Sequence, residues 1–356
     1  MAESEEFVSN IRIDIGGSQQ KDLVSDVIRL AVEDSIENPS MFHLVLADKD
    51  SKWIDSSLLN PEVGGDIKIY LGYIDSTVEP LFVGKIVALN PDFPTGGFQT
   101  LDVQGYDRSF FLQKTHSLKD NSNVQNGKDA STLVTKIAGA NGLSPKIDSE
   151  AGFTWADVVL VSPDESDYSV LRRVADMASL EFFVRDRNLT LRKPNYGDTA
   201  ATLEWGKEIL SMSFRMSTGK AVKKSIVRAY NPKDKSTYSS EKNTGESGTF
   251  SGTIASKYVA SSNFDSLILE QDLVFSNKTD VDKLAGALLD RANNSFVEGR
   301  CEIIGDAEIR AGRSVVINGA GKRFSGKYYI KSAKHSVGKE GYLLNLELRS
   351  MVTQNV

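Results

Sequence analysis

Short segments in which apolar and polar residues alternate recur along the first 110 residues, and turn signals separate them. The segment from Asn10 to Ile15 runs into Gly16-Gly17, and the segment from Asp66 to Leu71 follows Gly64-Gly65. A two-residue period sends alternate side chains to opposite faces of a β-strand, so each segment has one face for a core. Several such strands with regular turns predict a sandwich or barrel over residues 1–110.

The spacing of apolar residues becomes helical in residues 111–195. Apolar side chains recur every three or four positions from Ala130 to Ala140 and again after Asp167, which predicts two amphipathic helices. Asn141-Gly142 is a stop signal for the first helix, and Ser166 or Asp167 is a cap for the second. Two strands are predicted after them, at residues 180–184 and 189–192. This part therefore reads as a small α+β domain.

Strand-like segments return over residues 196–356. One helix is predicted at about 280–292, where Thr279 and Asp282 form a start that resembles a capping box. Residues 231–262 are rich in Ser, Gly, Thr and Lys, and predict a flexible loop or a long hairpin. The last part is therefore expected to be a second β-rich domain, although no convincing sequence repeat relates it to the first.

Charge and cysteine content limit the environment that the chain fits. The net charge is -6, but residues 1–120 hold 20 acidic and 10 basic side chains, and the remainder holds 28 acidic and 32 basic ones. An acidic first third argues against nucleic-acid binding there. The single cysteine, the acidic N-terminus without an apolar core and the lack of an 18-residue apolar run predict a protein made in a reducing bacterial cytoplasm, with neither a secretion signal nor a membrane span.

A search for catalytic or metal-binding groups yields no candidate. The three histidines, His43, His116 and His335, lack the spacing of metal ligands, and one cysteine cannot complete a zinc site. The acidic run Asp164, Glu165 and Asp167 is expected to cap the helix that follows, because acids are favoured at helix N-termini. We therefore predict no catalytic, cofactor or metal site, and no enzymatic activity.

Basic residues gather between Arg215 and Lys235, where only Asp234 opposes seven of them. Such a patch can contact an acidic partner or line a pore, and the alternative is a solvated strand face. The four candidates for a pore-facing or partner-facing patch are Lys220, Lys223, Lys224 and Arg228.

Two stretches together carry a resemblance to a known family. The first comprises Gln104 to Leu112, Ala130 to Ala140, Asp167 to Ala175 and Leu180 to Val184, and the second comprises Gly305 to Arg313, Arg323 to Ile330, His335 and Gly341-Tyr342. In order and spacing they resemble the phage late control gene D protein family, over roughly residues 7–350. That family includes baseplate hubs of contractile phages, the hub region of type VI secretion spike proteins and hubs of extracellular injection systems.

The resemblance implies a fold and an assembly. The fold would be α+β, mainly β, with two β-barrel domains like the tube subunit, at 1–110 and 196–356, and the small α+β domain between them. The chain would form a homotrimer that joins a sixfold inner tube to a threefold spike in the baseplate of a phage tail or a phage-tail-like particle. Its partners would be the inner tube protein, a spike protein encoded separately, baseplate wedge proteins and a tape-measure protein. Neither the kind of particle nor its cargo follows from the sequence.

Two alternatives remain open at this point. A distal-tail or tube-terminating adaptor would have a similar β-rich pattern and would form hexamers. A tail-associated cell-wall hydrolase would need catalytic carboxylates, for which Asp164 and Glu165 are the only candidates that we identified.

Overall fold

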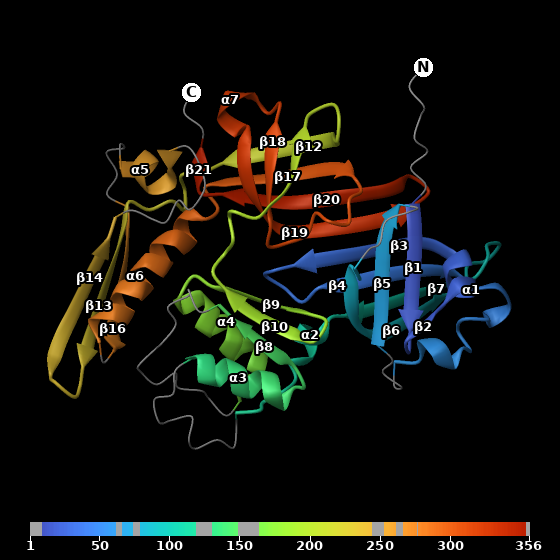
Figure 1. The fold of residues 1–356 in the computed structure, drawn as a ribbon, viewed down its shortest axis with the longest axis horizontal. Helices are drawn as coiled ribbons and strands as arrows, with labels where there is room; N and C mark the ends of the chain where they lie inside the picture. The colour runs from blue at the N-terminus through green and yellow to red at the C-terminus, as the bar shows by residue number, and fades with distance from the viewer. Residues whose placement is uncertain are drawn as a thin grey trace.

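The computed structural model describes residues 9–61, 66–73, 79–118, 130–148, 164–243, 253–260, 266–275 and 277–353. Strands dominate, and helices cluster in the middle of the chain and beside a small outlying sheet (Figure 1). This confirms the predicted α+β, mainly β, class. None of the helices within these ranges is long and apolar enough to cross a membrane.

The first part of the chain forms an antiparallel sheet with strand order β3-β4-β7-β6-β5-β1-β2. Strands β4, β5 and β7 alternate buried and half-buried residues, so one face covers a core that includes Phe42 and Trp53. The elements are β1 (Ser9–Ile15), β2 (Ser18–Gln19), α1 (Lys21–Ser25), β3 (Val27–Ser35), β4 (Met41–Ala47), β5 (Asp66–Tyr73), β6 (Phe82–Asp92) and β7 (Thr100–Tyr106), with 3-10 turns at Lys49–Ser51 and Ser57–Leu59.

The middle unit packs two helices on a three-stranded sheet of order β8-β10-β9. Its elements are α2 (Arg108–Phe111), α3 (Ala130–Ala140), β8 (Ser144–Ile147), α4 (Asp167–Met177), β9 (Glu181–Arg185) and β10 (Asn188–Arg192). Ser166 is the N-cap of α4, because its side chain accepts a hydrogen bond from the backbone of Ser169. The cap is therefore the first of the two predicted residues.

The last part builds a second sheet, of order β12-β17-β20-β19, to which β18 and β11 are added beside β19. Strand β19 also pairs with β3, so the two large sheets are continuous (Figure 1). The elements are β11 (Thr199–Glu204), β12 (Ile209–Met216), β17 (Val297–Ile304), β18 (Ser314–Asn318), α7 (Gly321–Phe324), β19 (Gly326–Gly338), β20 (Gly341–Ser350) and β21 (Val352–Thr353).

Between β12 and β17 the chain leaves the large sheet and forms an outlying lobe, residues 217–296, which we call the lobe. Its elements are β13 (Lys224–Asn231), β14 (Ser236–Lys242), β15 (Thr253–Ile254), α5 (Ala255–Ala260), β16 (Leu267–Val274) and α6 (Lys278–Asn293). Helix α6 covers one face of the sheet β14-β13-β16. Helix α6 occupies the position of the predicted helix, but its N-cap is Asn277 rather than Thr279.

The flexible loop predicted at residues 231–262 is wrong for its described parts. Strand β14 pairs with β13 along its length, from Ser225↔Lys242 to Asn231↔Ser236, so the long-hairpin alternative holds there. Residues 253–260 form β15 and the short helix α5. Serine and threonine suit a strand whose outer face is exposed, which composition alone does not separate from a loop. Residues 244–252 and 261–262 of the predicted loop lie outside the described residues.

The hydrophobic cores cross the expected divisions at residues 110 and 195, which stay a prediction. One core joins the middle unit to the lobe through Val227, Phe275 and Leu284. A second core, under the last sheet, includes Ile36 from the first part and Phe183 from the middle unit. The parts are thus packed on one another rather than strung along a linker.

Candidate functional site

The two large sheets contain the same arrangement of strands. The order β3-β4-β7-β6 in the first matches β12-β17-β20-β19 in the second, and β5 and β18 add to β6 and β19 in the same way. This is a structural repeat. The match ends at the next strand, because β1 is antiparallel to β5 whereas β11 is parallel to β18.

The pairing registers of the two sheets also agree. The β6–β7 register shifts between Ile86 and Ala88, and the β19–β20 register shifts between Ile330 and Ser332, 244 residues later (330 minus 86). The β3–β4 and β12–β17 registers likewise shift at equivalent points, after Val27 and after Ile209. Irregularities at matching positions re-aim a strand in the same way. The repeat therefore extends to details that the sequence does not reveal.

The two copies of the repeat meet at one joint and leave two edges open. At the joint, β19 pairs with β3 from Ser332↔Ser35 to Val337↔Leu30. The equivalent segment of β6, Ala88–Asp92, pairs with β7 on one side and with no strand of the described residues on the other. Strand β12 is the counterpart of β3, and within the same ranges it pairs with β17 alone. Open backbone donors and acceptors on such edges can pair with another chain.

A buried carboxylate ties the three parts together beside this joint. Asp34 of β3 accepts hydrogen bonds from Arg185 of β9, at 3.0 Å, and from Arg310 and the backbone of Ala311 in the last part, at 3.1 and 3.2 Å. Burial alone raises the pKa of Asp34, but the charges of Arg185 and Arg310 outweigh it and lower the pKa. A cavity of about 280 Å³ adjoins these side chains.

A second buried network lies between the middle unit and the last sheet. Glu181 of β9 accepts hydrogen bonds from the hydroxyl of Tyr329, at 2.7 and 2.8 Å, and from Arg192, at 2.8 Å. Arg192 also donates to the carbonyl of Gly312. Each buried charge thus has an opposite charge and further polar partners, as burial requires. We infer that the three parts form one stiff body.

A third carboxylate joins the ends of β4 and β7. Asp107 is the N-cap of α2 and accepts hydrogen bonds from Ser109, and from the backbone of Ser40 at 2.8 Å. Burial raises the pKa of Asp107 to about 6, against the opposing effect of these hydrogen bonds. The sequence pattern marked the turn after Tyr106 but gave no sign of this contact, because Ser40 lies 67 residues away.

The predicted basic patch is divided between a strand and the segment before it. Lys224 and Arg228 lie on β13, and Lys224 Nζ is 3.5 Å from a carboxylate oxygen of Glu241 on β14. Lys220 and Lys223 lie in the segment that leads from β12 into the lobe, where Lys220 is exposed and Lys223 half-buried. Whether these four residues face a pore or a partner stays a prediction.

The acidic run before α4 has structural partners. Asp167 is buried and accepts hydrogen bonds from Thr115, Ser117 and Asn141, while Glu165 pairs with Arg173 at 2.8 Å. No group of three or more histidine, cysteine or acidic residues within the described ranges could hold a metal ion.

The histidines have partners that the sequence did not indicate. His43 lies 2.5 Å from Asp102 across β4 and β7, and His116 lies 3.1 Å from the carbonyl of Glu165. His335 is fully buried beside Tyr342, and burial lowers its pKa to about 3.

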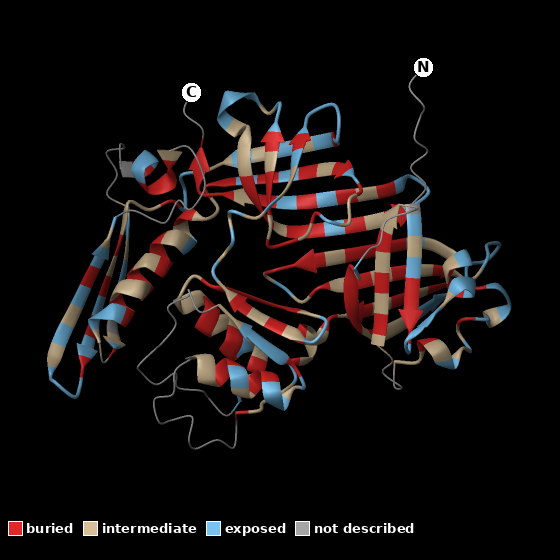
Figure 2. Ribbon diagram, viewed as in Figure 1, coloured by how far each residue is buried: buried red, intermediate tan, exposed pale blue. Residues whose placement is uncertain are grey.

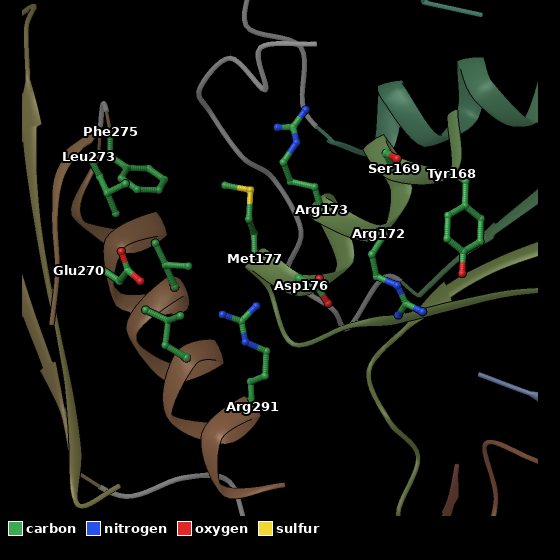
Figure 3. Close-up of a pocket in the computed structure, with 12 residues that line it drawn as sticks. Tyr168, Ser169, Arg172, Arg173, Asp176, Met177, Glu270, Leu273, Phe275 and Arg291 are labelled. Atoms are coloured by element: carbon green, nitrogen blue, oxygen red, sulfur yellow. The ribbon is translucent and has the colours of Figure 1, made fainter. Parts of the chain in front are cut away.

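A groove of about 520 Å³ lies between α4, α6 and β16 (Figure 3). Its floor includes Met177, Leu273 and Phe275. Arginine side chains stand around it, but Arg172 donates to the carbonyl of Glu37 and Arg173 pairs with Glu165, so two of them serve the protein's own packing. The groove holds no arrangement of acid, base and nucleophile that would indicate catalysis.

Comparisons with known proteins identify the family. The model of the family described as Alg8 N-terminal domain matches residues 5–339. The chain belongs to the Alg8 N-terminal domain family. The family's description names no activity. A search of curated proteins found no match to this Alg8 N-terminal domain.

Solved structures share the fold of this Alg8 N-terminal domain over almost its full length. The 43 kDa tail protein of prophage MuSo2 from Shewanella oneidensis is 12% identical, with a TM-score of 0.72 and coverage of 96% of this chain and 98% of that one. The tail protein from Neisseria meningitidis MC58 is 14% identical, with a TM-score of 0.70 and coverage of 97% of each chain. A type VI secretion component from E. coli, described as similar to phage T4 tail proteins gp27 and gp5, is 11% identical, with a TM-score of 0.57 and coverage of 98% and 77%. The fold is therefore that of tail proteins.

Proposed function

We propose that this chain is the trimeric hub of the baseplate in a contractile phage tail or a related injection system, as its resemblance to late control gene D proteins implies. The observation that carries the proposal is the structural repeat with one closed joint and two open edges. The shared fold of the tail proteins supports it. The role is mechanical and needs no catalytic group.

The repeat offers an answer to a mismatch of symmetry. A spike with threefold symmetry must be joined to a tube with sixfold symmetry, and closed rings need matched interfaces. Three chains with two equivalent sheets each would present six similar units to the tube while keeping a true threefold axis for the spike. The proposal thus uses the joint between β19 and β3 as the pattern for the contact between chains.

The open edges predict how neighbouring chains meet. If β6 of one copy pairs with β12 of the next as β19 pairs with β3, the 244-residue offset assigns Asn90 the role of Lys334, and the β12 counterpart of Glu33 is Arg215. We therefore expect Asn90 opposite Arg215, with Asp92 diagonal to that arginine. Opposite charges at diagonal positions of a strand pair stabilise it. Pro91 has no N–H, so this ladder would have one donor fewer than the joint.

Cysteine cross-linking tests this contact. The variant carrying Asn90→Cys and Arg215→Cys should give covalent species of two and three chains, and none larger, with a short thiol-reactive linker. The native Cys301 is buried and should not react. Asn90→Cys combined with Lys339→Cys, at an exposed turn, is the matched control and should stay mostly uncoupled. A trimeric protein whose Asn90–Arg215 pair does not cross-link would refute the proposed joint.

The assembled ring would have two working faces. One would begin the inner tube and the other would hold a separate spike protein, while wedge proteins and a tape-measure protein would contact the ring. The particle would place the chain in a baseplate after its synthesis in the cytoplasm. Co-assembly with a tube protein and a spike protein is the functional test, and failure to bind either would count against a hub.

A further inference from the structure

The lobe carries an apolar surface on the face of its sheet that α6 does not cover. Tyr230, Leu267, Leu269 and Val274 are 43%, 41%, 45% and 65% exposed. The pairings Ile226↔Leu269 and Tyr230↔Val274 put these side chains on the same face, whereas the buried Val227 and Ala229 point to the α6 side. Exposed apolar groups gathered on one face mark an interaction surface. We call this surface the outer face of the lobe.

The two edges of the same sheet differ in a way that points to pairing or packing at β16. The edge strand β14 carries serine, threonine, Glu241 and Lys242, which protect an edge from association. The opposite edge strand, β16, has the sequence LILEQDLV and no lysine or arginine. An apolar edge beside an apolar face is suited to burial, and Figure 1 shows the sheet on the outside of the molecule, with α6 between it and the rest of the chain.

We propose that the outer face of the lobe docks on a second copy of this chain, in the ring described above; the inference rests on that proposed trimer. The lobe is inserted between β12 and β17, so it begins at the C-terminal end of the open edge that we expect to meet the next copy. The inner side of the lobe is already occupied, because α6 contacts α4 of its own chain. The outer face therefore points away from its own middle unit and toward the neighbouring copy.

Charge favours a copy of this chain as the occupant. Lys224 and Arg228 lie on the outer face, and Arg228 is exposed. Residues 1–120 carry 20 acidic and 10 basic side chains, so the first part of a neighbouring copy presents a negative surface. An apolar centre with cations beside it, against an acidic partner, is the arrangement that gives a specific interface. This assigns two of the four residues of the basic patch to contact between chains.

Trimer formation measured against protein concentration and salt tests the inference. Arg228→Glu and Val274→Lys change exposed side chains, so each variant should fold, and thermal unfolding at high protein concentration checks this. We expect each variant to raise the concentration at which half the chains are trimeric by about tenfold or more. Lys339→Glu reverses an exposed charge outside the lobe and should leave that concentration within about twofold of the wild type.

The outcomes separate this inference from the proposed hub. If the wild type and both variants form trimers at the same concentration, the outer face is not a subunit contact, and the hub proposal stands without it. If the wild type forms no trimer at any concentration tested, the hub proposal fails and this inference fails with it. If Arg228→Glu and Val274→Lys weaken the trimer and Lys339→Glu does not, the inference holds.

Discussion

Replacement of Asp34 by asparagine should destabilise the protein strongly, because this carboxylate holds the three parts together. The variant keeps the shape of the side chain but leaves Arg185 and Arg310 beside a neutral group. Removal of one partner of a buried ion pair costs about 3–5 kcal/mol. The two arginine side chains are still 32% and 21% exposed, so water relieves part of the penalty. We therefore expect a loss of about 3 kcal/mol in the free energy of unfolding.

Urea unfolding at pH 7 and a fixed chain concentration measures this loss, because assembly makes apparent stability depend on concentration. Glu347→Gln is the matched control. It removes the same charge from the exposed pair Arg300–Glu347, whose side chains are 78% and 48% exposed, and should cost less than about 1 kcal/mol. An Asp34→Asn loss no greater than that of the control would refute the claim that this junction stiffens the molecule.

Three further predictions concern buried groups. The pKa of His335 is lowered to about 3, so the neutral ring stabilises the fold above pH 6.5 and this stability is lost as pH falls; between pH 6.5 and 5 the loss should be about 2 kcal/mol, and it should vanish in His335→Gln when the two unfolding curves are compared. Tyr329→Phe removes a donor to the buried Glu181 and should cost about 1–3 kcal/mol in urea unfolding. Gly105→Ala puts a methyl group 2.2 Å from a β6 carbonyl oxygen and should lower the melting temperature, whereas Gly139→Ala, in open space on α3, should not.

The fold class was accessible from the sequence because it depends on local pattern. Alternation in segments such as Asp66 to Leu71 reports a strand with one buried face, and helical spacing with the stop at Asn141-Gly142 reports α3. Residues 236–242 were misjudged for the same reason. Their serines and threonine resemble a loop in composition, and only the pairing with β13 makes them a strand.

The assembly surfaces were much less accessible, because they depend on contacts between distant residues. Asp34 and Arg310 lie 276 positions apart, and nothing in either segment predicts their ion pair. The structural repeat is likewise carried by pairing registers, which many different side chains satisfy. The basic patch was found as a charge run, but the sequence could not report that Lys224 and Arg228 share a sheet face with exposed leucines.

The native mass of the purified chain in solution, measured by light scattering, tests the central claim most directly. A mass near three times 39.0 kDa, 117 kDa, is the result that a trimeric hub predicts. A stable hexamer would contradict the hub and favour a tube adaptor, and a chain that stays at 39.0 kDa even with its spike protein present would contradict any ring built from this repeat.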